Sequence, residues 1–281
     1  MKVSVIIPTR SHVPPLLLGS LSIQTYRASE IIEVVGSALT VQRNEGIKQA
    51  TGDIILFIDD DIVLDSNYIK NVIENFQAFP RAVAVTGNVI TSAYKQNILY
   101  SVFARIFMLT YRSDGKFQVS GFPKNYHQKI DKRIRGEMLY GCNMALKREV
   151  FKKFRFCEDL DCRMFGEDDY FAWLLSRNNV VYYNPFAICY DNRPYPQGKQ
   201  ALKIRHTIFN LIKRNKSRHP SLIENAAFWW AFSGFIIFKI TEAIIMRDTS
   251  ILQGMIRCFM KYADLPIAEV RDNLIIRRLN V

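Results

Sequence analysis

Two groups of acidic residues are the parts of this sequence best suited to chemistry. The first, which we call the aspartate triplet, is Asp59, Asp60 and Asp61. It directly follows residues 53–58 (DIILFI), which predict a buried central strand, and ligands in open α/β sheets bind beyond the carboxyl ends of strands. Adjacent carboxylates repel one another unless a cation compensates their charge, and hard oxygen ligands suit Mg²⁺ or Mn²⁺. We therefore expect a divalent cation here, with a solvated acidic turn as the alternative.

The second group, which we call the acidic trio, is Glu167, Asp168 and Asp169. It follows Gly166 and precedes residues 170–175 (YFAWLL), a pattern that predicts the start of a helix. Asp169 is suited to cap that helix, while another carboxylate points into a cleft as a general base. Capping and solvation by all three residues is the alternative. Because both acidic groups lie where an element ends, we expect them to share one cleft.

The elements that must position these groups alternate between short β-rich and helical segments, which is the pattern of βαβ units. Predicted strands are residues 3–7, 30–35, 53–58, 83–90 and 180–184, and predicted helices are residues 16–26, 40–50, 67–79, 97–111, 149–154 and 169–177. Residues 112–135 are polar and irregular, which predicts a loop. The predicted fold class is α/β, with a mainly parallel central sheet flanked by helices over residues 1–198, and residues 199–281 form a second, helical region.

Five segments, in order along the chain, carry a family resemblance. They are residues 3–10 (VSVIIPTR), 21–26 (LSIQTY), 43–53 (RNEGIKQATGD) leading into 57–61 (FIDDD), 141–148 (GCNMALKR) and 166–169 (GEDD). Together they resemble a family 2 glycosyltransferase of the Rossmann-like GT-A fold, over residues 1 to about 195. The resemblance implies an inverting, metal-dependent enzyme that transfers a sugar from a nucleotide-diphosphate donor to an acceptor hydroxyl.

The resemblance also implies roles for single residues, with the aspartate triplet in the place of the family's DXD motif. Asp168 is the implied general base, and Asp59 and Asp61 are the implied metal ligands. The implied donor-binding residues are Pro8, Thr9, Arg10, Arg43, Asp59 and Asp60, and the acceptor-side residues are Asn143, Glu167 and Asp169. Three of these residues have structural alternatives: Pro8 ends a strand, Arg43 lies on a helix surface, and Asn143 occupies a turn.

The sequence departs from the family pattern in two places. Most relatives carry Asp-Asp-Gly-Ser after the second strand, whereas residues 33–37 read EVVGS, so we expect altered nucleotide recognition. No histidine lies between His127 and His206, where relatives often have a further metal ligand; Asp191 is the candidate substitute, or else a turn residue before Pro194. The first departure motivates an alternative function, a catalytically weak nucleotide-sugar binding module at the membrane.

Basic charge is concentrated in one segment. The 281 residues contain 38 Lys and Arg against 26 Asp and Glu, a formal charge of +12, and are 49% apolar, which excludes a disordered polymer. Residues 199–218 hold seven bases and no acid, and the apolar residues 226–245 follow, which predicts a membrane-surface element. Lys239 and Glu242 are costly at bilayer depth, so we expect an in-plane or re-entrant helix instead of a span, with a core helix covering the sheet as the alternative.

These features predict three partners: a nucleotide-sugar donor, a lipid-linked or glycan acceptor used in envelope polysaccharide assembly, and an anionic membrane surface. Nucleic acid is not expected, because the bases adjoin an apolar segment and no basic-aromatic RNA motif is present. The first residues (MKVSVIIP) lack the apolar core of a signal peptide, so the expected location is the cytoplasmic face of the membrane, in a peripheral or monotopic state.

Overall fold

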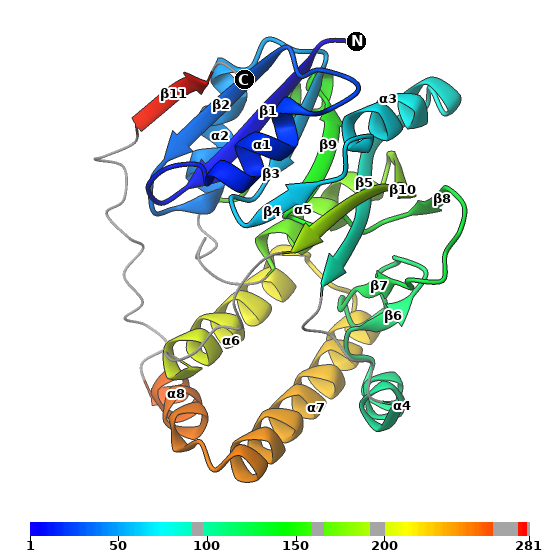
Figure 1. The fold of residues 1–281 in the computed structure, drawn as a ribbon. Helices are drawn as coiled ribbons and strands as arrows, with labels where there is room; N and C mark the ends of the chain where they lie inside the picture. The colour runs from blue at the N-terminus through cyan, green and yellow to red at the C-terminus, as the bar shows by residue number, and fades with distance from the viewer. Residues whose placement is uncertain (92–97, 159–165, 192–199, 261–274, 280–281) are drawn as a thin grey trace.

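The computed structural model describes residues 1–91, 98–158, 166–191, 200–260 and 275–279. A central sheet lies between helices, and a group of further helices extends from one end of it (Figure 1). The predicted α/β class is therefore confirmed.

Within the described residues the central sheet has nine strands, in the order β11-β2-β1-β3-β9-β5-β10-β4, with β8 also paired to β10. Their bounds are β1 Val3–Thr9, β2 Glu30–Val35, β3 Ile54–Ile58, β4 Ile62–Leu64, β5 Ala82–Thr91, β8 Ile134–Gly136, β9 Asn143–Lys147, β10 Val180–Asp191 and β11 Ile275–Leu279. Strand β1 is parallel to β2 and β3, and β10 is parallel to β5. The remaining pairings are antiparallel, so the sheet is mixed, where the sequence predicts a mainly parallel one.

Strand β9 is the main reason for this difference. It lies between β3 and β5 and runs antiparallel to both; the helix and short strands that precede it in the chain, from α4 to β8, do not place it parallel to its neighbours. Those short strands include β6 (Tyr111–Ser113) and β7 (Lys124–Tyr126), which form a small parallel pair, so the predicted loop over residues 112–135 contains some regular structure.

The apolar run of β3 is explained by burial on both faces of the sheet. Ile54, Leu56 and Ile58 face one core, while Ile55 and Phe57 face the other, as the two-residue period of a strand requires. The first core is completed by α1 (Pro15–Ser22) and α3 (Tyr68–Ala78), and the second by α2 (Leu39–Gln49), the 3₁₀ helix Arg148–Lys152 and α5 (Glu167–Ser176). These helices hold the sheet from both sides and fix the ends of its strands.

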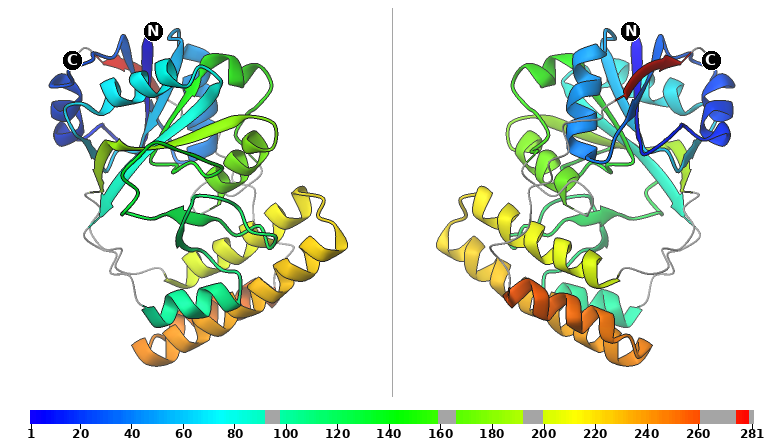
Figure 2. Two further views of the ribbon diagram at one scale, coloured as in Figure 1. Left: turned by 90° about the vertical axis from the view of Figure 1, so that its right-hand side faces the viewer. Right: turned by 90° about the vertical axis from the view of Figure 1, so that its left-hand side faces the viewer.

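The group of helices at one end of the sheet has a third core of its own. Its members are α4 (Ile98–Ile106), α6 (Gln200–Ser217), α7 (Leu222–Met246) and α8 (Thr249–Met260). Figure 2 shows them together below the sheet in both views. Among the described residues, the two sheet cores contain no residue of α7, so α7 is not a helix that covers the sheet.

Strand β11 returns from the helices to the sheet and pairs antiparallel with β2, from Ile275 opposite Val35 to Leu279 opposite Ile31. The segment predicted as a helical region over residues 199–281 therefore also contributes a strand to the sheet domain. The predicted boundary at residue 198 lies outside the described residues.

Candidate active site

The aspartate triplet forms the turn between β3 and β4. The Ile62 amide donates to the Asp59 carbonyl at 3.2 Å, and the Asp59 amide donates to the Cys142 carbonyl at 3.2 Å, which ties the turn to the start of β9. All three aspartates are partly exposed. In the antiparallel register of β4 and β10, Asp191 lies opposite Ile62, so the last residue of β10 is placed beside this turn.

The acidic trio forms the first turn of α5, where the free amides of a helix start favour negative charge. Both carboxylate oxygens of Asp168 accept backbone hydrogen bonds at 2.9 Å, Oδ2 from Gly141 and Oδ1 from Asp169. Only glycine fits at position 141, because a Cβ there would come within 2.7 Å of Asp168 Oδ2. The GCN segment therefore holds one acid of the trio by its backbone.

Arg43 joins the two acidic groups. Its Nη2 donates to Asp59 Oδ1 at 3.3 Å and its Nη1 to Glu167 Oε1 at 3.2 Å, while Nη2 also donates to the Gly141 carbonyl at 2.9 Å. The guanidinium is fully buried and lies 5.3 Å from the centre of the Phe156 ring. Residues distant in the sequence thus meet on a single side chain of α2.

The charges around Arg43 explain the protonation of this region. Burial works against its charged form, but Asp59 and Glu167 raise the pKa of Arg43 above its ordinary value, so the guanidinium stays charged. Burial and the charge of Asp168 raise the pKa of Glu167 to about 8, and Arg43 opposes this shift. Glu167 is therefore a carboxyl group that holds its proton to a higher pH than an exposed glutamate does.

Asp169 has a separate partner on α6. Its Oδ2 accepts from Arg214 Nη1 at 2.9 Å, and the Arg214 side chain is buried. Burial and the neighbouring Asp168 raise the pKa of Asp169 to about 6, against the lowering effect of Arg214. Two acids of the trio are thus paired with buried arginines, whereas within the described residues no Lys or Arg forms an ion pair with Asp168.

Comparison with known proteins supports the family resemblance. Residues 20–155, just under half of the chain, match the family model described as glycosyl transferase family 2. This match agrees with the resemblance to family 2 glycosyltransferases that the sequence motifs carry. The matched region contains Arg43, the aspartate triplet and Gly141, while β1 and the acidic trio lie outside it.

A glucosyl-dolichyl phosphate glucuronosyltransferase of Haloferax volcanii is 25% identical to this chain over 121 residues, which are 40% of the chain and 32% of that protein. The similarity therefore spans about a third of that relative's length. A mannosyltransferase of Pyrobaculum calidifontis, solved with GDP-Man and Mn²⁺, is 13% identical with a TM-score of 0.52, over 92% of this chain and 87% of that one. A GalNAc-T enzyme solved with UDP, GalNAc and Mn²⁺ is 12% identical with a TM-score of 0.52, over 86% and 57% of the two chains. At these identities the likeness concerns the fold, which is GT-A.

The residues predicted to bind the donor differ in exposure. Pro8 and Thr9 are buried as the last residues of β1, which continues through Pro8 where the sequence predicts its end. The Thr9 carbonyl accepts from Gln42 Nε2 at 2.8 Å, and Arg10 is exposed at the same strand end. Arg43 lies buried between carboxylates, so the alternative of a helix-surface residue is wrong. Its role at the donor stays a prediction.

Asn143 is also placed differently from the prediction. Its side chain is fully buried in β9, where Oδ1 accepts from Tyr68, Thr86 and the Gly87 amide, and Nδ2 donates to Cys189 Sγ at 3.1 Å. This side chain joins neighbouring strands and offers no surface to an acceptor. It also does not occupy a turn, the structural alternative.

Three contributions to the site are not predicted by the sequence. They are the Gly141 peptide, Arg214 and Glu33, whose buried carboxylate accepts from the Val13 amide at 2.9 Å and so holds the loop after β1. The glycine that opens the GCN segment could have indicated that this peptide contributes to the site. No sequence feature distinguishes Arg214, because it lies among other basic residues of the same helix.

The carboxylate oxygens of the aspartate triplet are the kind of ligand that a hard divalent cation prefers. Within the described residues, however, no three His, Cys, Asp or Glu side chains converge as a metal site. One or two carboxylates are sufficient when phosphate oxygens and water complete the coordination, as is usual for Mg²⁺. The triplet is therefore suited to a cation that the donor's diphosphate shares.

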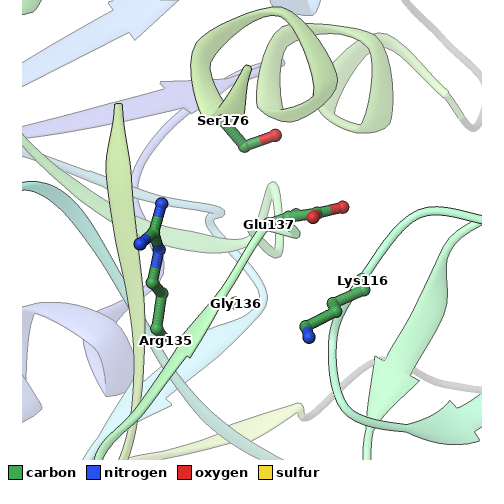
Figure 3. Close-up of a pocket in the computed structure, with 5 residues that line it drawn as sticks. All are labelled: Lys116, Arg135, Gly136, Glu137 and Ser176. Carbon is green, nitrogen blue, oxygen red and sulfur yellow. The ribbon is translucent and has the colours of Figure 1, made fainter. Parts of the chain in front are cut away.

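A separate cavity of about 270 Å³ lies beside β8 and the C-terminal end of α5 (Figure 3). Lys116, Arg135, Gly136, Glu137 and Ser176 line it, with Arg135 on β8 and Ser176 on α5. Gly136 is paired with Val181 near the start of β10, whereas Asp191 at its end lies beside the aspartate triplet. The cavity is thus not the predicted donor site.

Proposed function

We propose that this chain is an inverting, metal-dependent glycosyltransferase that moves a sugar from a nucleotide-diphosphate donor to the hydroxyl of a lipid-linked acceptor. The observation that carries the proposal is the junction at Arg43, which contacts Asp59 on the donor side and Glu167 on the acceptor side. Sugar transfer requires the leaving diphosphate and the general base to lie on opposite sides of one sugar, and Arg43 links the two acidic groups that we propose for these roles.

Asp168 is the proposed base. As the acceptor oxygen bonds to the anomeric carbon, the bond from that carbon to the diphosphate oxygen breaks, and the hydroxyl proton passes to the Asp168 carboxylate. Attack opposite the leaving group inverts the configuration. Each Asp168 oxygen accepts a single backbone hydrogen bond, so a lone pair is left for the acceptor proton, whereas Glu167 and Asp169 are paired with arginines.

Asp59 and Asp61 are the proposed ligands of Mg²⁺ or Mn²⁺, with Asp191 beside them in the strand register and Asp60 on the donor side. The cation would supply Lewis-acid stabilisation of the charge on the leaving diphosphate. Two proteins of similar fold were solved with Mn²⁺ and a nucleotide or nucleotide sugar, which supports this choice of cofactor. The exposed Arg10 and the end of β1 are the proposed nucleoside contacts.

The helices supply the argument for a lipid-linked acceptor at a membrane surface. Within the described residues, α7 is the one helix long and apolar enough to cross a membrane, but only 28% of its most apolar window is buried. It exposes Leu222, Ile223, Trp229, Ile244 and Ile245, and α4 exposes Ile98, Leu99 and Val102. Lys239 and Glu242 form an ion pair on α7, and its packing with α4 and α8 favours a helix that lies in the interface. The name of the Haloferax relative, which includes dolichyl phosphate, agrees with this acceptor class.

The function is tested with a panel of UDP-, GDP- and dTDP-sugars in the presence of Mn²⁺. A ligand at a hundred times its dissociation constant adds about 2.7 kcal/mol to stability, so the true donor raises the melting temperature. Transfer from that donor to acceptor membranes is then followed with labelled sugar, and NMR of the product gives its anomeric configuration. We expect transfer with inversion. Donor binding without transfer would instead support the binding-module alternative, and retention of configuration would contradict the role of Asp168.

Membrane association is tested by flotation with phosphatidylglycerol-containing vesicles. Replacing Ile223 and Ile245 by serine removes two exposed apolar side chains of α7, each worth about 1.5–3 kcal/mol when fully buried, so partitioning should fall about tenfold or more. Ile23→Ser, at an exposed position after α1, is the matched control and should float like the native protein. An equal loss in both variants would exclude α7 as the contact.

A further inference from the structure

The basic segment of residues 199–218 does not direct all of its charge outward. Arg214 and Arg218, in α6 and just after it, are only 5% and 8% exposed. A membrane-facing base would keep its head group in water or at lipid phosphates, so these two arginines have another role.

The C-terminal end of α6 is fitted against the first turns of α5. The Tyr170 hydroxyl donates to the Ser217 carbonyl at 3.4 Å, and the Arg218 guanidinium lies 4.9 Å from the centre of the Trp173 ring. A Cβ at Gly121, where φ is +82°, would come within 1.5 Å of Arg218 Nη1. Because Gly121 has no side chain, the Arg218 guanidinium can lie directly against its backbone.

Arg214 occupies the position nearest the acidic trio. Its Nη1 donates to Asp169 Oδ2 at 2.9 Å. A Cβ at Gly166, where φ is +118°, would come within 3.3 Å of Arg214 Nη1. The Asp169 amide in turn donates to Asp168 Oδ1 at 2.9 Å. One side chain of α6 is therefore two contacts away from the proposed base.

We propose that Arg214 is a positioning residue for sugar transfer: by holding the Asp169 side chain it fixes the first turn of α5 and with it the orientation of the Asp168 carboxylate. This inference rests on the proposed function, in which Asp168 is the base. It makes the C-terminal helices part of the catalytic machinery in addition to any role at the membrane.

The physical reason is the crowding of negative charge at the start of α5. Without the guanidinium, the partly buried Asp169 carboxylate would face Asp168 with no compensating charge, and the turn that contains both would rearrange to separate them or to expose Asp169 further to water. The Asp169 amide would then move away from Asp168 Oδ1. Misplacement of a reacting group by about 1 Å costs as much as 10²-fold in rate.

The experiment compares Arg214→Met and Arg214→Lys with Arg218→Met, which removes an equally buried arginine of the same segment that does not contact the trio. We expect Arg214→Met to lower kcat by about 10- to 100-fold while the affinity for the donor found in the panel changes less than about twofold. Arg214→Lys should restore part of the rate. In Asp169→Asn the uncompensated charge is absent, so adding Arg214→Met to that variant should cost far less than it does alone.

Hydrogen exchange of the first turn of α5, residues 168–170, which does not include the Arg218 contact at Trp173, supplies a readout that does not depend on turnover. Faster exchange there in Arg214→Met, but not in Arg218→Met, would support the link to α5. The inference is overturned if Arg214→Met keeps the native kcat, or if both methionine variants lose the same activity in proportion to lost stability. If Asp168→Asn transfers sugar at the native rate, the proposed function itself fails and the positioning role fails with it. If the native protein transfers no sugar, unchanged exchange in Arg214→Met overturns the link on its own.

Discussion

The two acidic groups of this chain are held in different ways. The aspartate triplet is a turn between strands, is partly exposed, and has the Arg43 guanidinium 3.3 Å from Asp59. The acidic trio is a helix start that two buried arginines contact, one from α2 and one from α6. The triplet is therefore the more open group, which suits the proposed role of holding a cation that arrives with the donor, whereas side chains of the protein fix the trio.

The largest effect is expected at Asp168, the member of the trio that no arginine of the described residues contacts. Asp168→Asn keeps the size of the side chain but does not take up a proton at neutral pH, so kcat should fall by about 10²–10⁴-fold at nearly unchanged donor affinity. Asp131→Asn, at an exposed loop position, is the matched control and should retain the native rate. Rates are measured with labelled donor and acceptor membranes. A native rate in Asp168→Asn would contradict the proposal that Asp168 is the base while Glu167 and Asp169 are held by arginines.

Arg43 is the residue on which the two groups meet, so its loss should affect stability most. Arg43→Met leaves Asp59 and Glu167 without their shared partner, and breaking a buried pair in this way costs about 3–5 kcal/mol. Urea unfolding measures the change. Arg10→Met removes an exposed arginine at the neighbouring strand end and should stay within about 0.5 kcal/mol of the native protein. Equal stabilities for the two variants would show that Arg43 is not the junction.

Gly141 tests whether Asp168 depends on the backbone of the GCN segment. In Gly141→Ala the new Cβ would lie 2.7 Å from Asp168 Oδ2, so the carboxylate must move. The rate should fall by as much as about 10²-fold, with donor binding preserved. Gly19→Ala is the control, because a Cβ at position 19 has nothing within 4 Å. If donor affinity falls as much as the rate does, the substitution has disturbed the aspartate triplet and not only Asp168.

Removal of divalent cations should affect the donor side alone. With EDTA, the diphosphate and the triplet repel each other, so donor affinity should weaken at least about tenfold, or roughly 1.4 kcal/mol. Asp61→Ala should bind the donor weakly both with and without Mn²⁺. Calorimetry in the two buffers measures this, and the native protein binding equally well in both would contradict the metal assignment.

The pH dependence of stability tests Glu167, the member of the trio that contacts Arg43. The pKa of Glu167 is raised by burial in the folded state, so the folded protein binds the extra proton and stability is lost as pH rises from about 4.5 toward about 8. The slope for one proton is at most about 1.4 kcal/mol per pH unit. Glu167→Gln removes this titration, so its stability should fall less than that of the native protein over the same range. Parallel curves from urea unfolding at pH 5 and pH 8 would show that Glu167 is already ionised beside Arg43.

Much of the fold was predictable because burial leaves a local signal. The run in β3 is apolar throughout since both faces are covered, and the acids that follow it mark the strand end. The mixed sheet was not predictable in the same way, because β9 has the composition of a buried strand whichever direction it runs. Asn143 illustrates a second limit: a polar residue saturated by buried partners looks the same in sequence as one that lines a site.

The arginines show the same limit for the candidate site. Nothing near position 43 reveals that its side chain turns inward, since its partners Asp59 and Glu167 are distant in the chain. Arg214 lies in one helix with Lys213 and Lys216, and only the position of α6 against α5 sets it apart. The sequence predicts the two acidic groups as candidates, but it does not reveal which arginines contact them.

The return of β11 to the sheet changes how the helices are attached mechanically. The chain leaves the sheet at the end of β10 and rejoins it at β2, so α6, α7 and α8 belong to a stretch of chain whose two ends both lie in the sheet. A pull on these helices by a lipid surface would therefore reach the sheet at both β10 and β2. Deleting β11 would release one of these two attachments, and it would also bare the hydrogen-bonding edge of β2, which is a template for the association of two sheets.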